Sequence, residues 1–306
     1  MKKVVIAGGT GFLGKMLRAH FTQCNYQVVV LSRSTHRGAD NISYVKWDGE
    51  NLGKWKNEME GAHALINLCG KSVDCRYTER NKKQIYDTRL KSTKILGKAI
   101  KDCENPPKVW INSSSATIYR HAEDRDMDEE TGEIGTGFSV DVCQKWENTF
   151  FDSITPGTRK VALRIAIVLG KESGALQPLR NLATIGFGGR QGNGSQYFSW
   201  IHEKDFINSV NFIVENKELS GVYNVAAPNP VKNVQFMSIL KKALKIPFGV
   251  PMHKWMLEMG ALIIRTETEL ILKSRRVVPK KLIEEGYKFQ FPNLEKALSN
   301  LVHKEP

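Results

Sequence analysis

The chain has few features that would link it to an oxidising compartment, a metal or a membrane. Its 306 residues include only five cysteines, an odd number, and no two of them are spaced as C-x-x-C. A disulfide framework or a metal site is therefore not expected. No run approaches the ~18 consecutive apolar residues of a membrane span, and the first apolar run is too short for a signal peptide. We expect a cytoplasmic protein that no membrane holds.

The chain also has fewer acidic than basic side chains. The chain has 32 Asp and Glu residues against 45 Lys and Arg residues, which gives a formal net charge of +13 at pH 7. The basic residues are spread through the chain, and the densest cluster, residues 273–276, is short. Such a surplus attracts phosphates in general, but without a stacking platform or a reading motif it predicts no specific binding to nucleic acid.

The most informative segment that is present is a glycine-rich turn near the N-terminus. An apolar run at residues 3–7 passes directly into Gly8-Gly9-Thr10-Gly11-Phe12-Leu13-Gly14. Apolar residues then recur at helical spacing: Leu13, Met16, Leu17 and Phe21. Without side chains the backbone can approach a pyrophosphate, and the helix N-terminus presents free N–H groups to it. The strand before the turn and the helix after it predict a dinucleotide site formed by Gly8, Thr10, Gly11, Phe12, Leu13 and Gly14.

The end of the second expected strand indicates which dinucleotide binds. Residues 26–31 are typical of a strand, and it ends in Ser32-Arg33, with Arg37 a few residues further on. An acidic residue there would accept hydrogen bonds from a ribose 2′-hydroxyl and favour NAD. A guanidinium instead pairs with a 2′-phosphate through two parallel hydrogen bonds. Unless Arg33 is only a solvated surface charge, the cofactor is NADP rather than NAD.

Strands and helices alternate through the first half of the chain. We expect strands at residues 42–47, 62–68, 108–111 and 160–169, and helices at residues 80–100 and 138–150. This alternation predicts an α/β protein, a Rossmann doubly wound parallel sheet with helices on both faces. Ligands bind such sheets beyond the carboxyl ends of the strands. Two groups of residues at such ends should therefore border the cofactor: Leu68, Cys69 and Gly70, and Ser113, Ser114 and Ser115.

Several motifs together resemble those of the extended short-chain dehydrogenases/reductases of the NAD-dependent epimerase/dehydratase-like family. They are the Gly8/Gly11/Gly14 turn, Asn67-Leu68-Cys69-Gly70, Ser113-Ser114-Ser115-Ala116-Thr117-Ile118-Tyr119, Trp200-Ile201-His202-Glu203-Lys204-Asp205 and Gly221-Val222-Tyr223-Asn224-Val225-Ala226. Other motifs are similar to those of an atypical subgroup, the epimerase-family proteins with a C-terminal domain of unknown function. They are Trp47-Asp48, Thr88-Arg89-Leu90, Val142-Cys143-x-x-Trp146-Glu147 and Arg276-Val277-Val278-Pro279. The resemblance covers essentially the whole chain, and it is more specific for the fold than for a reaction.

The resemblance implies a second, smaller α+β domain on the substrate side. The chain offers no clean linker, so we expect the two domains to be interwoven. The Rossmann domain would comprise residues 1–169 together with residues 200–226, and the C-terminal domain would comprise residues 170–199 and 227–306. We expect a small-molecule substrate and a monomer or homodimer.

The motif that performs hydride chemistry in short-chain dehydrogenases is missing. In a Tyr-x-x-x-Lys pair the lysine lowers the pKa of the tyrosine, which then exchanges a proton with the substrate oxygen. No such pair occurs between residues 115 and 161. Aligned on Glu147, the sequence has Ser139 at the tyrosine position and Cys143 at the lysine position. Lys145 lies two residues further on and should point to another face of the helix.

The remaining candidates for catalysis are Ser115 or its neighbour Ser114, Cys143 and Arg89. The serine would donate a hydrogen bond. Cys143 could serve as a thiolate nucleophile or base, or it could simply pack in the core. Arg89 takes the place of an asparagine that is catalytic in many relatives, and it would stabilise an oxyanion or bind a carboxylate or phosphate. Tyr119 resembles a structural or pocket-lining residue.

Two functions stay open at this point. The first is an NADP-dependent oxidoreductase or epimerase-like enzyme with a replaced proton-transfer group and a substrate that is anionic or has a carbonyl polarised toward Arg89. The second is a catalytically inactive NADP-binding protein that acts as a redox sensor or a protein/RNA-interaction module. The retained serine favours the first function, and the lost tyrosine and lysine favour the second. Our interpretation is the first. His202 and Asp205 resemble a packing and hydrogen-bonding pair at the junction of the two domains.

Overall fold

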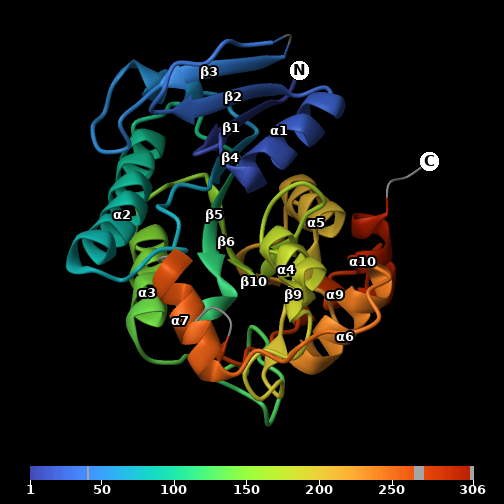
Figure 1. Cartoon of the computed structure of the whole chain (residues 1–306). Helices are drawn as coiled ribbons and strands as arrows, with labels where there is room; N and C mark the ends of the chain where they lie inside the picture. Colours follow the sequence, from blue (N-terminus) through green and yellow to red (C-terminus); the bar gives the residue numbers. More distant parts are fainter. Residues whose placement is uncertain (40, 265–271, 304–306) are drawn as a thin grey trace.

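A seven-stranded parallel sheet is the largest element of the computed structural model, which describes residues 1–39, 41–264 and 272–303 (Figure 1). The strand order is β10-β6-β5-β4-β1-β2-β3, and every pairing within this sheet is parallel. This confirms the Rossmann-like α/β fold. The strands are β1 (Lys3–Ala7), β2 (Gln27–Ser32), β3 (Ile42–Lys46), β4 (Ala64–Asn67), β5 (Val109–Ser115), β6 (Arg159–Ile165) and β10 (Gly221–Val225).

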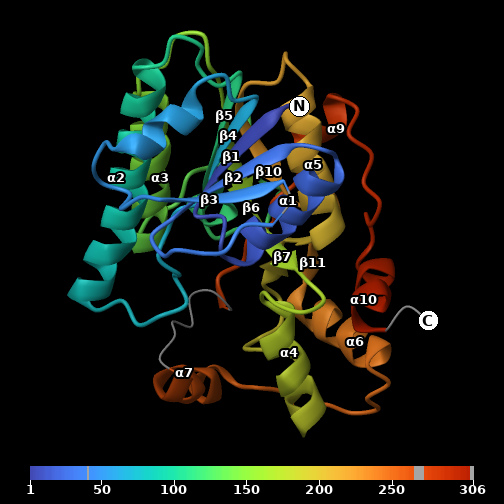
Figure 2. The same cartoon turned by 90° about the horizontal axis from the view of Figure 1, so that it is seen from above.

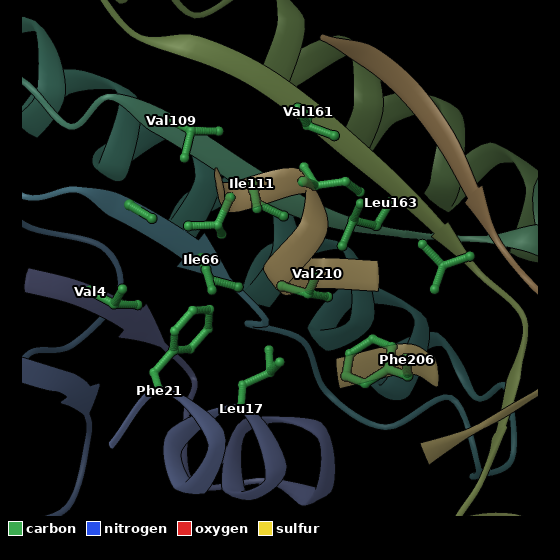
Figure 3. Packing of buried hydrophobic residues seen from close by; sticks show 14 of the residues in the cluster. Val4, Leu17, Phe21, Ile66, Val109, Ile111, Val161, Leu163, Phe206 and Val210 are labelled. Atoms are coloured by element: carbon green, nitrogen blue, oxygen red, sulfur yellow. The ribbon is translucent and has the colours of Figure 1, made fainter. Parts of the chain in front are cut away.

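The sheet is buried on both faces because its strands are apolar at nearly every position. Along β1 the side chains alternate, so Val4 and Ile6 enter one core while Val5 and Ala7 enter the other. Helices α1 (Phe12–Gln23) and α5 (Glu203–Glu215) cover the first face, and α2 (Glu79–Lys101) and α3 (Phe138–Phe151) cover the second (Figure 2). Figure 3 shows the first core, where side chains of α1 and α5 meet the strands.

The observed strands differ from the expected ones in two places. Strand β5 extends through the serines to Ser115, so these residues form the end of the strand rather than the segment after it. The expected strand at residues 160–169 is wrong, because the chain forms two strands there. After β6, the Ala166 N–H donates to the Val225 carbonyl (3.0 Å), and the Ile167 N–H donates to the Ser199 carbonyl (3.2 Å). Strand β7 (Ile167–Leu169) therefore pairs with β9 (Trp200–His202) in a separate sheet, and continuous burial conceals the change in the sequence.

A further hydrophobic core lies beyond the large sheet. It includes Trp200 of β9 and is filled by apolar side chains of α4 (Leu176–Leu182), α6 (Asn233–Ala243) and α10 (Leu294–Val302). The other elements of this part are β8 (Tyr197–Phe198), β11 (Val231–Lys232), α7 (Lys254–Ile264) and α9 (Lys280–Glu284). Within the described ranges, no helix has both the length and the apolar character needed to cross a membrane. The domain boundaries inferred from the sequence stay a prediction.

Candidate functional site

A cavity of about 530 Å3 opens where β1, β4 and β5 end at their carboxyl side. It is lined by most of the residues that were predicted for the cofactor and for catalysis: Gly8, Gly11, Phe12, Leu13, Gly14, Leu68, Cys69, Gly70, Arg89, Ser113, Ser114, Ser115 and Cys143. These residues come from five separate stretches of the chain, three at strand ends and two, Arg89 and Cys143, on helices α2 and α3. The parallel sheet brings them together because its strands all end at the same edge.

The glycine turn has the shape that a pyrophosphate requires. Gly11 precedes the first turn of α1, whose N–H groups receive no side-chain cap from it. A Cβ on Gly11 would meet no atom within 4 Å, so its hydrogen faces open space. A Cβ on Gly14 would lie 2.5 Å from the Cα of Gly9, which shows how closely α1 packs against the turn. Gly8 adopts φ +74°, the left-handed region that favours glycine. The turn and the helix N-terminus could therefore hold a phosphate through backbone groups.

Buried amides fix the end of β4 beside this turn. Asn67 Oδ1 accepts a hydrogen bond from the Cys69 N–H (3.1 Å), and Asn67 Nδ2 donates to Asn112 Oδ1 (2.7 Å) and Thr93 Oγ1 (3.1 Å). Burial raises the pKa of the Cys69 thiol to about 12, so it is protonated at neutral pH. Cys69 thus serves here as a neutral part of the cavity lining.

The three serines at the end of β5 have different surroundings. Ser113 Oγ is buried in the cavity lining and has no hydrogen-bond partner among the described residues. Ser114 Oγ donates to Glu147 Oε1 (2.6 Å), which commits it to the interior. Ser115 is half-buried, and its Oγ lies 2.7 Å from Thr117 Oγ1. The buried Ser113 hydroxyl, which has no described partner, fits a polar ligand. Of the two serines considered for catalysis, Ser114 and Ser115, Ser115 is the better placed hydrogen-bond donor.

The glutamate behind Ser114 belongs to a buried ion pair. Arg164 of β6 donates to both carboxylate oxygens of Glu147 (2.8 Å and 3.0 Å), and the two side chains are only 11% and 8% exposed. Arg164 Nη1 also donates to the Tyr119 hydroxyl (2.9 Å), which lies 2.9 Å from Asn224 Oδ1. Tyr119 is buried and is not part of the cavity lining among the described residues. Its contacts fit the structural role predicted for it.

Arg89 lines the cavity beside Gly70. Its Nη1 donates to the carbonyls of Lys71 (3.0 Å) and Ile85 (3.1 Å), and its guanidinium lies 5.0 Å from the Trp146 ring centroid. A Cβ on Gly70 would lie 2.9 Å from the guanidinium carbon, so only glycine lets the two approach. Among the described residues, no carboxylate pairs with Arg89. Burial lowers the pKa of Arg89, as expected for a cation that no anion compensates.

Cys143 stands at the lysine position of helix α3 and is 5% exposed. Burial, and to a smaller extent Glu147, raises the pKa of its thiol to about 12. The positive charge of Arg89 opposes this increase and does not cancel it. The thiol is therefore protonated at neutral pH, which favours packing or hydrogen-bond donation over a thiolate nucleophile. Lys145 is exposed and pairs with Asp141 (2.8 Å), on another face of the helix as expected.

Four predicted cofactor residues are not among the described residues that line the cavity: Thr10, Ser32, Arg33 and Arg37. Arg33 follows β2 and is exposed. Arg37 is also exposed. Neither guanidinium forms an ion pair with a described residue, so both could contact a phosphate beyond the turn. No group of three or more acidic, histidine or cysteine side chains that could hold a metal occurs in the described ranges.

Sequence reasoning missed several further residues that line the cavity. They come from the segment between β4 and α2 and from α3: Lys71, Ser72, Val73, Tyr77, Phe138, Val142 and Trp146. The Tyr77 hydroxyl lies 3.3 Å from Ser139 Oγ, and its ring centroid lies 4.7 Å from that of Phe138. One signal was available, because loops at the carboxyl edge of a parallel sheet contribute to ligand sites.

Comparison with known proteins agrees with this geometry. Residues 4–139 match the NAD dependent epimerase/dehydratase family, and residues 254–301 match a domain of unknown function, DUF1731. The chain is 33% identical over 304 residues to the epimerase family protein YfhF of Bacillus subtilis, a match that covers 98% of this chain and 97% of that protein. The chain belongs to the epimerase family. The resemblance predicted from the motifs is confirmed.

Solved structures of the epimerase family have the same fold. The human epimerase family protein SDR39U1, crystallised with NADPH, superposes with a TM-score of 0.85 at 26% identity, over 98% of this chain and 99% of that one. The UDP-N-acetylglucosamine 4-epimerase from Bacillus cereus gives a TM-score of 0.77 at 17% identity, over 99% of this chain and 98% of that one. At that identity the second likeness shows the fold alone.

In this epimerase-family chain, His202 and Asp205 connect α5 to the C-terminal segment. The His202 ring stacks on Phe291 with centroids 3.8 Å apart, and its Nε2 lies 3.1 Å from Asn300 Oδ1. Asp205 accepts hydrogen bonds from the backbone N–H groups of Gln290 and Phe291, both at 2.8 Å. Burial lowers the pKa of His202 to about 4. These contacts fit the packing and hydrogen-bonding role predicted for the pair, and neither residue lines the cavity.

Proposed function

We propose that the protein is an NADP-dependent oxidoreductase or epimerase-like enzyme whose small-molecule substrate presents an anionic group or a carbonyl to Arg89. One observation supports this most directly. A single cavity joins the glycine turn and the serine-bearing end of β5 to a half-buried arginine with no described carboxylate partner. A cofactor-binding protein without turnover has no need for an uncompensated cation beyond its cofactor.

The cofactor class follows from the turn and from the relatives. SDR39U1 was crystallised with NADPH, and the family description names NAD, so a nicotinamide dinucleotide is the cofactor we infer. Gly11, the N-terminus of α1 and the unpartnered Ser113 hydroxyl fit this group. When bound, it would supply or accept a hydride. Exposed Arg33 and Arg37, without ion-pair partners in the described part of the chain, support NADP over NAD.

Arg89 would bind and polarise the substrate rather than exchange a proton with it. A guanidinium keeps its proton in proteins, and its fork matches a carboxylate, a phosphate or a developing oxyanion. Two carbonyls already hold Nη1, which orients the rest of the group in advance. Ser115 would donate a further hydrogen bond to the substrate oxygen. Buried Cys143 would pack behind this site with its thiol protonated.

Calorimetry and a turnover screen test the proposal together. Titration with NADPH and NADH should show tighter binding of NADPH. NADPH oxidation should then be measured with pairs of carbonyl compounds that differ only in a carboxylate or phosphate, and the anionic member should be favoured. Arg89→Lys should lose this preference because it lacks the planar fork. Arg80→Lys, on the exposed surface of the same helix, is the matched control.

Two results would contradict the proposal. No binding of either dinucleotide would refute the cofactor assignment. Binding without any turnover, together with unchanged behaviour of Arg89→Lys, would instead favour the alternative, an inactive NADP-binding protein that serves as a redox sensor or an interaction module.

A further inference from the structure

A tyrosine hydroxyl is present at the place where the family motif is interrupted. Ser139 occupies the tyrosine position of the missing Tyr-x-x-x-Lys pair, according to the alignment on Glu147. The Tyr77 hydroxyl lies 3.3 Å from Ser139 Oγ, although the two residues are 62 positions apart in the chain. Both residues line the cavity. The phenol thus comes from the loop before α2 instead of from α3.

Arg89 lines the same cavity as this phenol. It projects from α2 to Gly70. Ser139 at the tyrosine position and Cys143 at the lysine position of the missing pair line this cavity as well. The guanidinium therefore supplies a positive charge in the wall that both positions of that pair share. The hydrogen bonds from Nη1 to the carbonyls of Lys71 and Ile85 hold it there.

We propose that Tyr77 is the residue that exchanges a proton with the substrate oxygen, and that Arg89 stabilises the phenolate that results. The proposal rests on the proposed function and adds its missing acid. It restores the tyrosine and the positive charge of the family mechanism from two other elements of the fold.

Reduction of a carbonyl would use both side chains. A bound reduced nicotinamide would supply the hydride to the carbonyl carbon and would itself be oxidised by two electrons. The carbonyl oxygen takes the proton of the Tyr77 hydroxyl, and the phenolate pairs with Arg89. Water then returns a proton to the phenolate. The reverse sequence oxidises an alcohol.

Two other tyrosines lie near the site, and their hydroxyls have partners outside the cavity. The Tyr119 hydroxyl is enclosed by Arg164 and Asn224, and burial raises its pKa. The Tyr86 hydroxyl donates to Asp141, and burial, with this carboxylate, raises its pKa as well. Neither residue lines the cavity among the described residues, whereas Tyr77 does.

The pairing can be tested without knowing the substrate. Benzenesulfonyl fluoride reacts with a phenolate oxygen at sulfur and releases fluoride, so its rate reports a phenol that is accessible and activated by a cation. At pH 8, peptide mapping should find Tyr77 modified faster than the other seven tyrosines. Arg89→Gln should slow this at least about tenfold, the lower end of the effect of an adjacent opposite charge. Arg80→Gln, the surface control, should not change the labelling rate of Tyr77. Arg89→Lys keeps the positive charge and should retain most of the rate, which shows that the effect of Arg89→Gln comes from loss of charge and not from misfolding.

A second measurement separates this inference from the proposed function. NADPH affinity in Tyr77→Phe should stay within about twofold of the unmodified protein, while any turnover found in the carbonyl screen should fall by about 10²–10⁴-fold, the usual contribution of a general acid. Absence of NADPH binding to the unmodified protein would contradict the proposed function only. Labelling of Tyr77 no faster than of the other tyrosines, an equal rate in Arg89→Gln, or full turnover in Tyr77→Phe would overturn the role of Tyr77.

Discussion

The two sides of the cavity are built in different ways. On the turn side, Gly8, Gly11, Gly14 and the N-terminus of α1 present backbone groups, and the absence of side chains creates the space. On the helix side, Arg89, Tyr77 and Cys143 present functional groups, and their positions depend on buried contacts across α2, α3 and β5. A backbone site is retained as long as the glycines are retained. A side-chain site can exchange its reacting groups while the fold remains the same.

The largest effect on stability is expected when the buried ion pair between Glu147 and Arg164, behind the helix side of the cavity, is broken. Glu147→Ala leaves Arg164 buried without its partner and removes the acceptor of Ser114. We expect the free energy of unfolding to fall by about 3–5 kcal/mol, measured by urea denaturation. The double variant Glu147→Leu with Arg164→Met should lose much less, because no buried charge then remains. If the free energy of unfolding fell equally in the two variants, packing and not charge would be what stabilises the helix side of the cavity.

On the turn side, Gly11→Val should remove cofactor binding without unfolding the protein. The added side chain meets no protein atom within 4 Å at its Cβ, so it would occupy the space left for the pyrophosphate. We expect the affinity for NADPH and NADH to fall at least a hundredfold, roughly 2.7 kcal/mol. Calorimetry measures the binding and thermal unfolding measures the stability. Ala19→Val, exposed on the same helix, is the control. Unchanged affinity would remove the turn from the binding site.

Arg33→Ala tests whether a side chain adds selectivity to the backbone site. If Arg33 contacts the 2′-phosphate, the variant should lose about 1.5–3 kcal/mol of binding free energy for NADPH, the value of a charged hydrogen bond. Binding of NADH should change little. Arg37→Ala, measured in the same way, shows which of the two arginines contributes more. Equal weakening of both dinucleotides by calorimetry would contradict the assignment.

The smallest effect is expected for Cys143. With its pKa raised to about 12, the thiol is ionised in roughly one molecule in ten thousand at pH 8, so iodoacetamide should modify exposed Cys24 long before it modifies Cys143. The alkylation rate of Cys143 should stay low from pH 7 to pH 10. Cys143→Ala should change the free energy of unfolding by no more than about 1 kcal/mol and leave NADPH affinity unchanged. Rapid alkylation of Cys143 at pH 8 would instead support its role as a thiolate nucleophile or base.

The same difference between the two sides decides what the sequence could predict. The glycine turn was predictable because a strand, a turn and a helix lie next to one another in the chain. The apolar runs predicted most strands of the large sheet. The rest of the cavity lining was predicted only where a motif marked it, as at Ser115 and Arg89. Tyr77 lies far in sequence from Ser139, and no local pattern indicates that the two meet. The division of residues 159–169 into β6 and β7 was hidden for a related reason, because both strands are buried.

The strands β6 and β10 are neighbours in the sheet but lie far apart in the chain. Strand β6 needs β10 beside it, yet β7, β8 and β9 are synthesised in between. On the ribosome the large sheet stays incomplete until Val225 has emerged, when α4 and β9 of the further core are already present and α6 and α10 are still to be synthesised. The large sheet can therefore be completed before the further core. A crossover near residue 169 would take β6 from one parent and β10 from the other, so a chimera made there would form the large sheet only if the two strands still match.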